Sequence, residues 1–215
     1  MPELPEVETT VRGLARYLEG ERIEQVALGR PDMRFPFPAN LVQTLTGARV
    51  VGLGRRAKYG LVHTDRDDTM VFHLGMSGRW RIDPEAIGKH DHLILATAGH
   101  RFALCDPRRF GFVDLVRTAE LEAWPPFAAM GPEPLGPELT ARYLQTALAG
   151  RKQAIKLMLL DQRIVAGLDR FGEHRADRFD VYGREAAACR RGDGGTVRRI
   201  VQGGRSTWYC PRCQH

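Results

Sequence analysis

The sequence predicts an α+β protein in which an N-terminal helix and a β-sandwich are followed by a small helical segment and a C-terminal, zinc-finger-like β-hairpin. Valines and leucines recur at helical spacing between residues 7 and 18. Short apolar or alternating stretches, separated by turn residues, fill residues 49–117, which is typical of a sandwich or a barrel. Three cysteines gather near the C-terminus with the spacing of metal ligands.

The first helix follows the N-terminal residues MPELPEVE, and its apolar face consists of Val7, Val11, Leu14 and Leu18. Removal of Met1 would leave Pro2 with a secondary amine. An α-amino group titrates near a pH of about 8, so part of it is unprotonated at neutral pH and can act as a nucleophile. Glu3 beside it is a candidate general acid or base. The alternative is that Pro2 only starts the helix.

The β-domain is predicted from the alternation and the turn signals that bound each stretch. Strands are expected at residues 23–28, 49–56, 60–64, 69–74, 80–83, 92–97, 101–106 and 111–117. Residues 30–40, rich in proline and phenylalanine, are expected to form a loop. Cys105 lies alone in an apolar stretch, so we expect it to be buried as a small hydrophobic side chain.

A linker is predicted at residues 131–138, GPEPLGPE, because three prolines and two glycines cannot continue a strand. The expected domains are therefore residues 1–130, 131–180 and 181–215. Helices are expected at residues 138–149, closed by Gly150, and at 152–161, with an apolar face of Ile155, Met158 and Leu159. A hairpin is expected from residues 196–201 and 205–210, joined by a turn at 202–204.

Positive charge is concentrated at the C-terminal end. The net charge of the chain is +6, and from residue 181 onward seven arginines face Glu185 and Asp193, a balance of +5. Such a tail suits a polyanion, although a solvated arginine surface is the alternative. With no apolar run of membrane length and no visible signal peptide, we expect a cytoplasmic protein.

Eight short motifs occur in a fixed order along the chain. They are PELPEVET (2–9), KYG (58–60), HLGMSG (73–78), KHDH (89–92), DPRRFG (106–111), LLDQ (159–162), VYGRE (181–185) and GRSTWYCPRCQ (204–214). Together they closely resemble the formamidopyrimidine-DNA glycosylase family, which consists of bifunctional DNA glycosylases and abasic-site lyases.

The resemblance implies a base-excision repair enzyme that removes oxidised purines, formamidopyrimidine and 8-oxoguanine, from damaged double-stranded DNA. It implies an imine at Pro2, protonation of the sugar ring oxygen by Glu3, and β,δ-elimination assisted by Lys58 and Arg205. A monomer without a redox cofactor is expected. From the residues alone, Lys58 would be a solvated turn lysine and Arg205 a hairpin surface arginine.

DNA-binding residues are implied by the same resemblance. Met76, Arg108 and Phe110 suit a wedge that fills the space left by a flipped base, since that task needs apolar bulk and a hydrogen-bond donor. Phosphate contacts are implied for His73, His90, Arg109 and Lys152. Without the resemblance, Met76 and Phe110 would be taken for core side chains and Arg108 for a surface charge.

The sequence departs from the family pattern after Leu168, where several tens of residues are absent and the asparagine that grips a phosphate has no counterpart. Two alternatives follow. One is a catalytically impaired DNA-binding remnant, because backbone contacts supply much of the affinity for DNA. The other is an endonuclease VIII-like glycosylase for oxidised pyrimidines.

The metal pattern is incomplete. Cysteines occupy three of the four expected positions, namely Cys189, Cys210 and Cys213. Gly192 stands where the fourth cysteine is expected, but Asp193 follows it, and a carboxylate can also bind zinc. We therefore predict one structural zinc ion in a Cys3Asp site. The alternative is a metal-free hairpin held by packing of Trp208 and Tyr209 on the helices.

Overall fold

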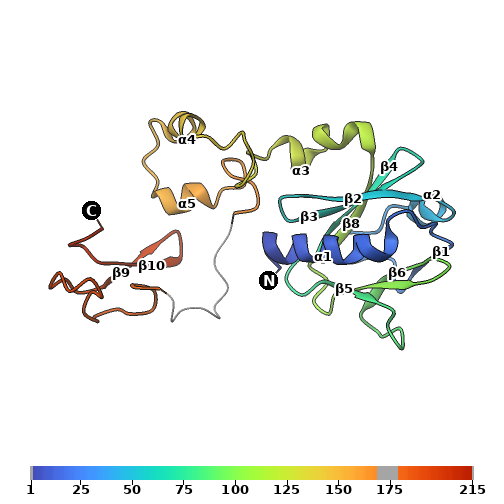
Figure 1. Cartoon of the computed structure of the whole chain (residues 1–215), viewed down its shortest axis with the longest axis horizontal. Coiled ribbons are helices and arrows are strands. Elements are labelled where there is room, and N and C mark those ends of the chain that lie inside the picture. Colours follow the sequence, from blue (N-terminus) through green and yellow to red (C-terminus); the bar gives the residue numbers. More distant parts are fainter. Residues whose placement is uncertain (1, 169–178, 215) are drawn as a thin grey trace.

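The computed structural model describes residues 2–168 and 179–214. Figure 1 shows a β-rich N-terminal domain on one side and helices α4 and α5 with the hairpin β9–β10 on the other, joined through the chain that follows α3. This arrangement confirms the predicted α+β class and the order of its parts. Among the described residues, the structure contains no helix both long and apolar enough to cross a membrane.

The N-terminal domain is a sandwich of two four-stranded antiparallel sheets, ordered β1-β6-β7-β5 and β2-β3-β4-β8. The strands are β1 Gln25–Leu28, β2 Val50–Arg56, β3 Tyr59–Thr64, β4 Asp68–His73, β5 Arg79–Ile82, β6 Asp91–Ala96, β7 Arg101–Cys105 and β8 Phe112–Arg117. Each lies within two residues of the predicted bounds. Helix α2, Leu41–Leu45, follows the predicted loop and was not predicted from the sequence.

The core lies between the two sheets and helix α1, Leu4–Leu18, whose predicted apolar face is fully buried. Helix α1 packs against β2, β3 and β5. Gly60 on β3 faces the buried Phe72 ring, and a Cβ atom at Gly60 would lie 2.1 Å from its Cζ atom. Cys105 is buried as predicted, and burial raises the pKa of its thiol.

The chain leaves the sandwich through η1, Thr118–Ala123, and α3, Pro125–Ala128. Residues 131–138 contain no helix or strand, as predicted. Helix α4, Ala141–Leu148, begins after Thr140, whose hydroxyl accepts a hydrogen bond from the Tyr143 backbone N–H at 3.0 Å. Helix α5 spans only Ile155–Leu159, so the prediction of a helix over 152–161 was too long. Its N-cap, Ala154, has no side-chain acceptor for the first backbone N–H groups.

Two residues of this segment depart from their predicted places. Lys152 precedes α5 instead of starting it, and Ile155 is exposed instead of lying on the apolar face. The apolar contacts here are made by Met158, Ile164 and Val165, a small cluster that has no place for Ile155. The shortening predicted after Leu168 falls on residues 169–178, which lie outside the described residues.

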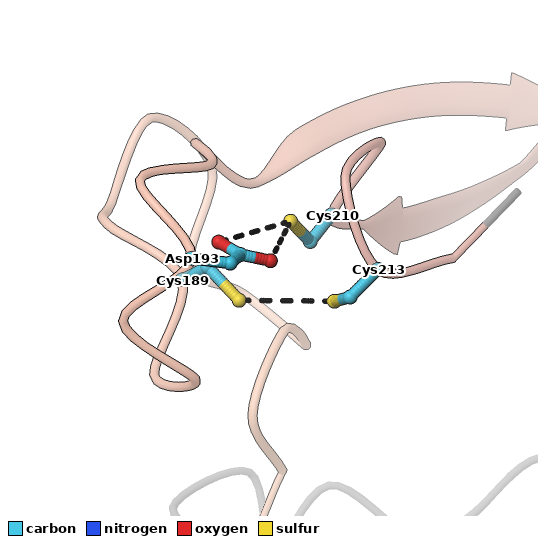
Figure 2. A group of neighbouring side chains, drawn as sticks. All are labelled: Cys189, Asp193, Cys210 and Cys213. Carbon is cyan, nitrogen blue, oxygen red and sulfur yellow. Dashed lines mark hydrogen bonds between the residues drawn. The ribbon is translucent and has the colours of Figure 1, made fainter.

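The C-terminal hairpin consists of β9, Arg198–Gln202, and β10, Arg205–Tyr209. Gln202 pairs with Arg205, so the turn is the two residues Gly203 and Gly204, shorter than predicted. Both glycines have positive φ, 55° and 72°, as a tight hairpin turn requires. Figure 2 shows Cys189 and Asp193 on the loop before β9, facing Cys210 and Cys213 beyond β10.

The hairpin packs against α5. The Lys156 ammonium donates hydrogen bonds to the Ser206 carbonyl and, at 2.8 Å, to the Thr207 hydroxyl. Gly203 approaches the Leu157 side chain so closely that a Cβ atom at this glycine would lie 2.9 Å from Leu157 Cδ2. These contacts fix the position of the hairpin on the helical segment.

Candidate functional site

The predicted nucleophile lies at the start of α1. Glu3 is the N-cap residue of the helix, and its backbone N–H donates to the Glu6 carboxylate at 3.0 Å. The Lys58 ammonium lies 2.7 Å from the Glu3 carboxylate, and the two side chains are only 13% and 17% exposed. The expectation of a freely projecting turn lysine is therefore wrong. Pro2 is thus followed directly in the chain by a shielded carboxylate in contact with a shielded ammonium.

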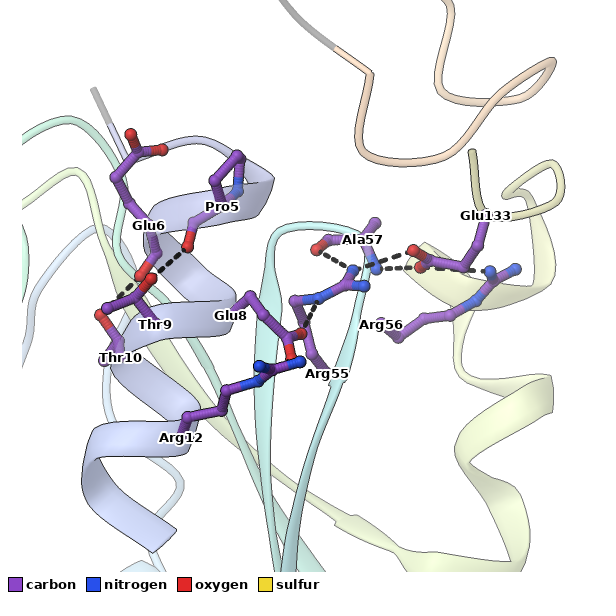
Figure 3. Close-up of polar contacts among 10 residues, drawn as sticks. All are labelled: Pro5, Glu6, Glu8, Thr9, Thr10, Arg12, Arg55, Arg56, Ala57 and Glu133. Atoms are coloured by element: carbon purple, nitrogen blue, oxygen red, sulfur yellow. Dashed lines mark hydrogen bonds and ion pairs between the residues drawn. The ribbon is translucent and has the colours of Figure 1, made fainter. Parts of the chain in front are cut away.

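A network of arginines and glutamates holds the turn that carries Lys58 (Figure 3). The Glu133 carboxylate, from the linker, accepts hydrogen bonds from the Ala57 backbone N–H and from Arg55 Nη1, the latter at 2.9 Å. Arg55 Nε also donates to the Glu8 carboxylate at 2.8 Å, and this contact holds the pKa of Glu8 below its usual value. Arg55 thereby connects helix α1, the β2–β3 turn and the linker.

The helical segment approaches the start of α1 and the β2–β3 turn through residues that Gln162, the last residue of the LLDQ motif, holds in place. Its side-chain carbonyl accepts from the Gly167 N–H at 2.7 Å, and its amide donates to the Leu168 carbonyl at 2.9 Å. Gly167 has a φ of 75°, and a Cβ atom there would lie 2.7 Å from Leu4 Cδ1 and 3.3 Å from Ala57 Cα. The positive φ, together with these contacts, favours glycine at this position.

A cavity of about 400 Å³ lies where the domain and the helical segment meet. Its lining residues are Lys58, Tyr59, His73, Pro126, Ala129, Met130, Leu160, Gln162 and Arg163. The cavity therefore brings together Lys58 and His73, two of the predicted site residues, with Gln162 from the far side of the linker. It is an opening of mixed polar and apolar character, with basic side chains from both parts of the chain.

His73 is a neutral hydrogen-bond donor in this cavity. Its Nδ1 accepts from the Gly75 backbone N–H at 3.1 Å, which assigns the ring proton to Nε2. The ring stacks on Phe112 with centroids 5.6 Å apart. Burial, followed by the charges of Lys58 and Arg34, lowers the pKa of His73 to about 4. His73 can therefore donate to a phosphate or sugar oxygen without carrying a charge at neutral pH.

The predicted wedge residues lie on two loops that pack together. Met76 and Phe110 are 40% and 43% exposed, although both would be taken for core residues without the family resemblance. The Arg108 guanidinium lies over the Phe110 ring, 4.8 Å from its centroid. Gly75 abuts Phe110, since a Cβ atom at Gly75 would lie 2.4 Å from the Phe110 carbonyl carbon. Exposed apolar bulk and a cationic donor are thus presented side by side.

Asp106, which was not predicted from the sequence, organises these loops. It is fully buried, and its carboxylate accepts hydrogen bonds from the Ser77 hydroxyl and, at 2.8 Å, from the Gly111 N–H. It also accepts a longer bond from the Arg108 N–H at 3.3 Å. A buried carboxylate needs such partners. The position of Asp106 at the start of the DPRRFG motif is the signal in the sequence that could have identified it.

The remaining predicted DNA-binding residues are divided between the two parts of the chain. His90 is half-buried, and its carbonyl accepts from the Asp106 N–H at 2.9 Å. Arg109 has a φ of 57° and lies 3.6 Å from Asp32. Lys152 and Arg205 lie beyond the linker, Lys152 on an exposed loop and Arg205 at the first position of β10.

The metal cluster has the dimensions of a zinc site. The ligand atoms of Cys189, Asp193, Cys210 and Cys213 all lie within 4.8 Å of one another. The sulfur atoms of Cys189 and Cys213 are 3.8 Å apart, and Cys210 Sγ is 3.5 Å from Asp193 Oδ2. Tetrahedral zinc with ordinary bond lengths would separate two thiolates by about 3.8 Å and a thiolate from a carboxylate oxygen by about 3.5 Å. The cluster is consistent with one structural zinc ion.

Comparison with known proteins agrees with these features. The family model of the formamidopyrimidine-DNA glycosylase N-terminal domain matches residues 1–113, and that of the zinc finger found in FPG and IleRS matches residues 194–215. Formamidopyrimidine-DNA glycosylases of Erythrobacter litoralis and Novosphingobium aromaticivorans are 58% and 54% identical, and each alignment covers all of both chains. The first alignment has 270 positions against 215 residues here, so 270 − 215 = 55 positions are gaps in this chain, in agreement with the predicted shortening.

Solved structures give the same result. The Lactococcus lactis Fpg in complex with abasic-site DNA is similar with a TM-score of 0.82 at 25% identity, covering all of both chains. The complex of that protein with Fapy-dG DNA has a TM-score of 0.81 at 26% identity, covering 99% of this chain and all of the other. The identity of 58% over the full length of both chains, together with the matched N-terminal domain, shows that the chain belongs to the formamidopyrimidine-DNA glycosylase family.

Proposed function

We propose that this base-excision repair glycosylase and abasic-site lyase acts on oxidised purines through a covalent imine at Pro2. The observation that carries the assignment of residues is the 2.7 Å contact between Lys58 and Glu3 directly after the N-terminal proline. Removal of Met1 would place a secondary amine next in sequence to this shielded carboxylate and ammonium, and these are the groups that imine formation and elimination require.

The first step replaces the base. The Pro2 nitrogen attacks the sugar C1′ atom, the glycosidic bond breaks, and the base leaves with the bonding electrons. Glu3 accepts the proton that the amine loses and delivers it to the ring oxygen. The sugar then opens, and an iminium joins Pro2 to C1′.

Strand cleavage follows from the iminium. Its positive charge acidifies the C2′–H bond, and loss of that proton expels the 3′ phosphate in the β-elimination. A second proton loss expels the 5′ phosphate in the δ-elimination. Lys58 and Arg205 assist these eliminations, and the neutral His73 N–H is available to a sugar or phosphate oxygen beside Lys58.

DNA is held open by the wedge of Met76, Arg108 and Phe110, with His90, Arg109 and Lys152 on the phosphates. Exposed aromatic and cationic side chains on one pair of loops support this assignment. Zinc held by the Cys3Asp cluster would brace the hairpin that presents Arg205. We further propose that the chain acts as a monomer in the cytoplasm.

Borohydride trapping of the imine tests the proposal. Wild-type protein is expected to form a trapped complex with duplexes containing 8-oxoguanine or an abasic site, whereas Pro2→Gly should form none and should bind the abasic duplex within a few fold of wild type. Equal trapping by both proteins would remove Pro2 from the mechanism. Absence of trapping by wild type would favour a DNA-binding remnant, and trapping only with an oxidised pyrimidine would change the substrate.

A further inference from the structure

We propose that residues 30–37, here called the Arg34 loop, form an additional DNA-contacting element in which Arg34 binds a backbone phosphate and Phe35 packs against the adjoining nucleotide. The inference rests on the proposed function because its ligand is the same duplex. None of the eight motifs includes this loop, and its residues were expected only to connect two structural elements.

The Arg34 loop has a defined conformation. Met33 and Phe37 are buried in the core of the sandwich, and Asp32 and Pro36 form an isolated antiparallel bridge. The Phe37 N–H donates to the Pro31 carbonyl at 3.1 Å. Because the two buried side chains anchor both ends, the residues between them are held outward. Phe35 is 54% exposed, so its ring is accessible to a ligand.

The loop adjoins the wedge. The Arg34 N–H donates to the Gly111 carbonyl at 3.1 Å, and the Phe35 ring makes an edge contact with Phe112, with centroids 5.6 Å apart. Asp32 lies 3.6 Å from Arg109, a predicted phosphate contact. A duplex that engages the wedge would therefore pass close to the Arg34 loop.

Charge supports a polyanionic partner. In the part of the chain that the structure describes, no ion pair or side-chain hydrogen bond engages the Arg34 guanidinium, which lies 5.5 Å from the Phe35 centroid. Asp32, the acid of this loop, instead contacts Arg30 at 2.8 Å and Arg109. The positive charge of Arg34 also acts on His73 in the cavity. Burial lowers the pKa of His73 most, and the charges of Lys58 and then Arg34 lower it further.

A phosphate is the ligand that this arrangement fits best. Guanidinium binds phosphate oxygens through two parallel hydrogen bonds, and an exposed aromatic ring beside it can pack on a sugar or a base. Arg34 and Phe35 offer both groups at neighbouring positions. Together with Arg109, they extend the basic rim of the wedge along the sandwich.

The salt dependence of binding tests the inference on the full chain, with an abasic-analogue duplex as the probe. Loss of one phosphate contact lowers the slope of log K against log salt by about 0.9, which corresponds to about eightfold weaker binding at 0.1 M salt. We expect these changes for Arg34→Ala. Arg34→Lys should restore most of the slope, and Phe35→Ala should weaken binding without changing the slope.

Arg16→Ala is the matched control, because Arg16 is also exposed and the same charge is removed. It lies about 20 Å along α1 from Glu3 at 1.5 Å per residue. An unchanged slope in Arg34→Ala, or an equal change in Arg16→Ala, would overturn the inference and leave Arg34 a solvated surface residue. Imine trapping by the wild-type protein on a duplex of the same sequence with a natural abasic site, which can form the imine, reports the proposed function separately.

Discussion

Lowering the pH should destabilise the protein through His73 before most carboxylates titrate. The fold lowers the pKa of this imidazole from 6.5 to about 4, by burial first and then by the charges of Lys58 and Arg34. The unfolded chain therefore binds more protons than the native protein between these two values. The resulting stability is complete above pH 6.5 and is lost as the pH falls toward 4.

The size of the effect follows from the shift. Proton linkage gives a loss of about 2 kcal/mol at pH 5 relative to pH 8 if the whole shift is effective. His73 is only half-buried, so solvent screening reduces this to about 1 to 2 kcal/mol. The replacement His73→Asn removes the titration, and its Oδ1 atom can occupy the position of Nδ1 and still accept from the Gly75 N–H.

Urea denaturation of both proteins at pH 8 and pH 5 measures the difference. Wild type should lose about 1 to 2 kcal/mol more unfolding free energy than His73→Asn between these pH values. Other titrating groups are the same in both proteins, so their contributions cancel. Equal losses in the two proteins would show that His73 is not held neutral by the fold, and the assignment of its donor tautomer would then fail.

Three further predictions concern the network, the wedge and the metal. Glu133→Ala should lower the unfolding free energy by about 1 to 3 kcal/mol and slow cleavage of an abasic duplex. Glu133→Gln keeps an acceptor for the backbone N–H and should have smaller effects on both quantities. Equal effects of the two variants in urea titrations and cleavage assays would argue against the network. Arg108→Ala and Phe110→Ala should impair cleavage of a duplex lesion more than that of an abasic single strand, because unstacking costs a few kcal/mol only in the duplex; equal rate losses would make them folding residues. Asp193→Ala should lower zinc affinity far more than Asp193→Cys in a chelator competition, and unchanged affinity in Asp193→Ala would remove this ligand.

Local patterns were sufficient for the elements of the sandwich. The spacing of Val7, Val11, Leu14 and Leu18 gave the buried face of α1, and turn residues bounded the strands. The ends of α5 and of the hairpin turn were wrong because they depend on a missing cap at Ala154 and on the pairing of Gln202 with Arg205. Neither feature has a reliable signal within a few residues.

The candidate site could be predicted residue by residue but not as a set of contacts. Glu133 lies 78 residues from Arg55, and Asp106 lies 29 residues from Ser77, so no periodicity in the sequence connects the members of either pair. Family motifs gave Glu3 and Lys58 as separate residues. Their ion pair, and the burial that keeps it from water, required the folded structure.

The contacts that fix the start of α1 come from residues up to Leu168. Arg55 connects the helix to the linker, and Gln162 holds Gly167 against Leu4 and Ala57. These contacts at the start of α1 therefore all lie before the shortening predicted after Leu168. Because Lys156 also fixes the hairpin on α5, Arg205 depends on the same helical segment. The chemistry proposed at Pro2 thus relies on contacts that lie within the described residues 2–168.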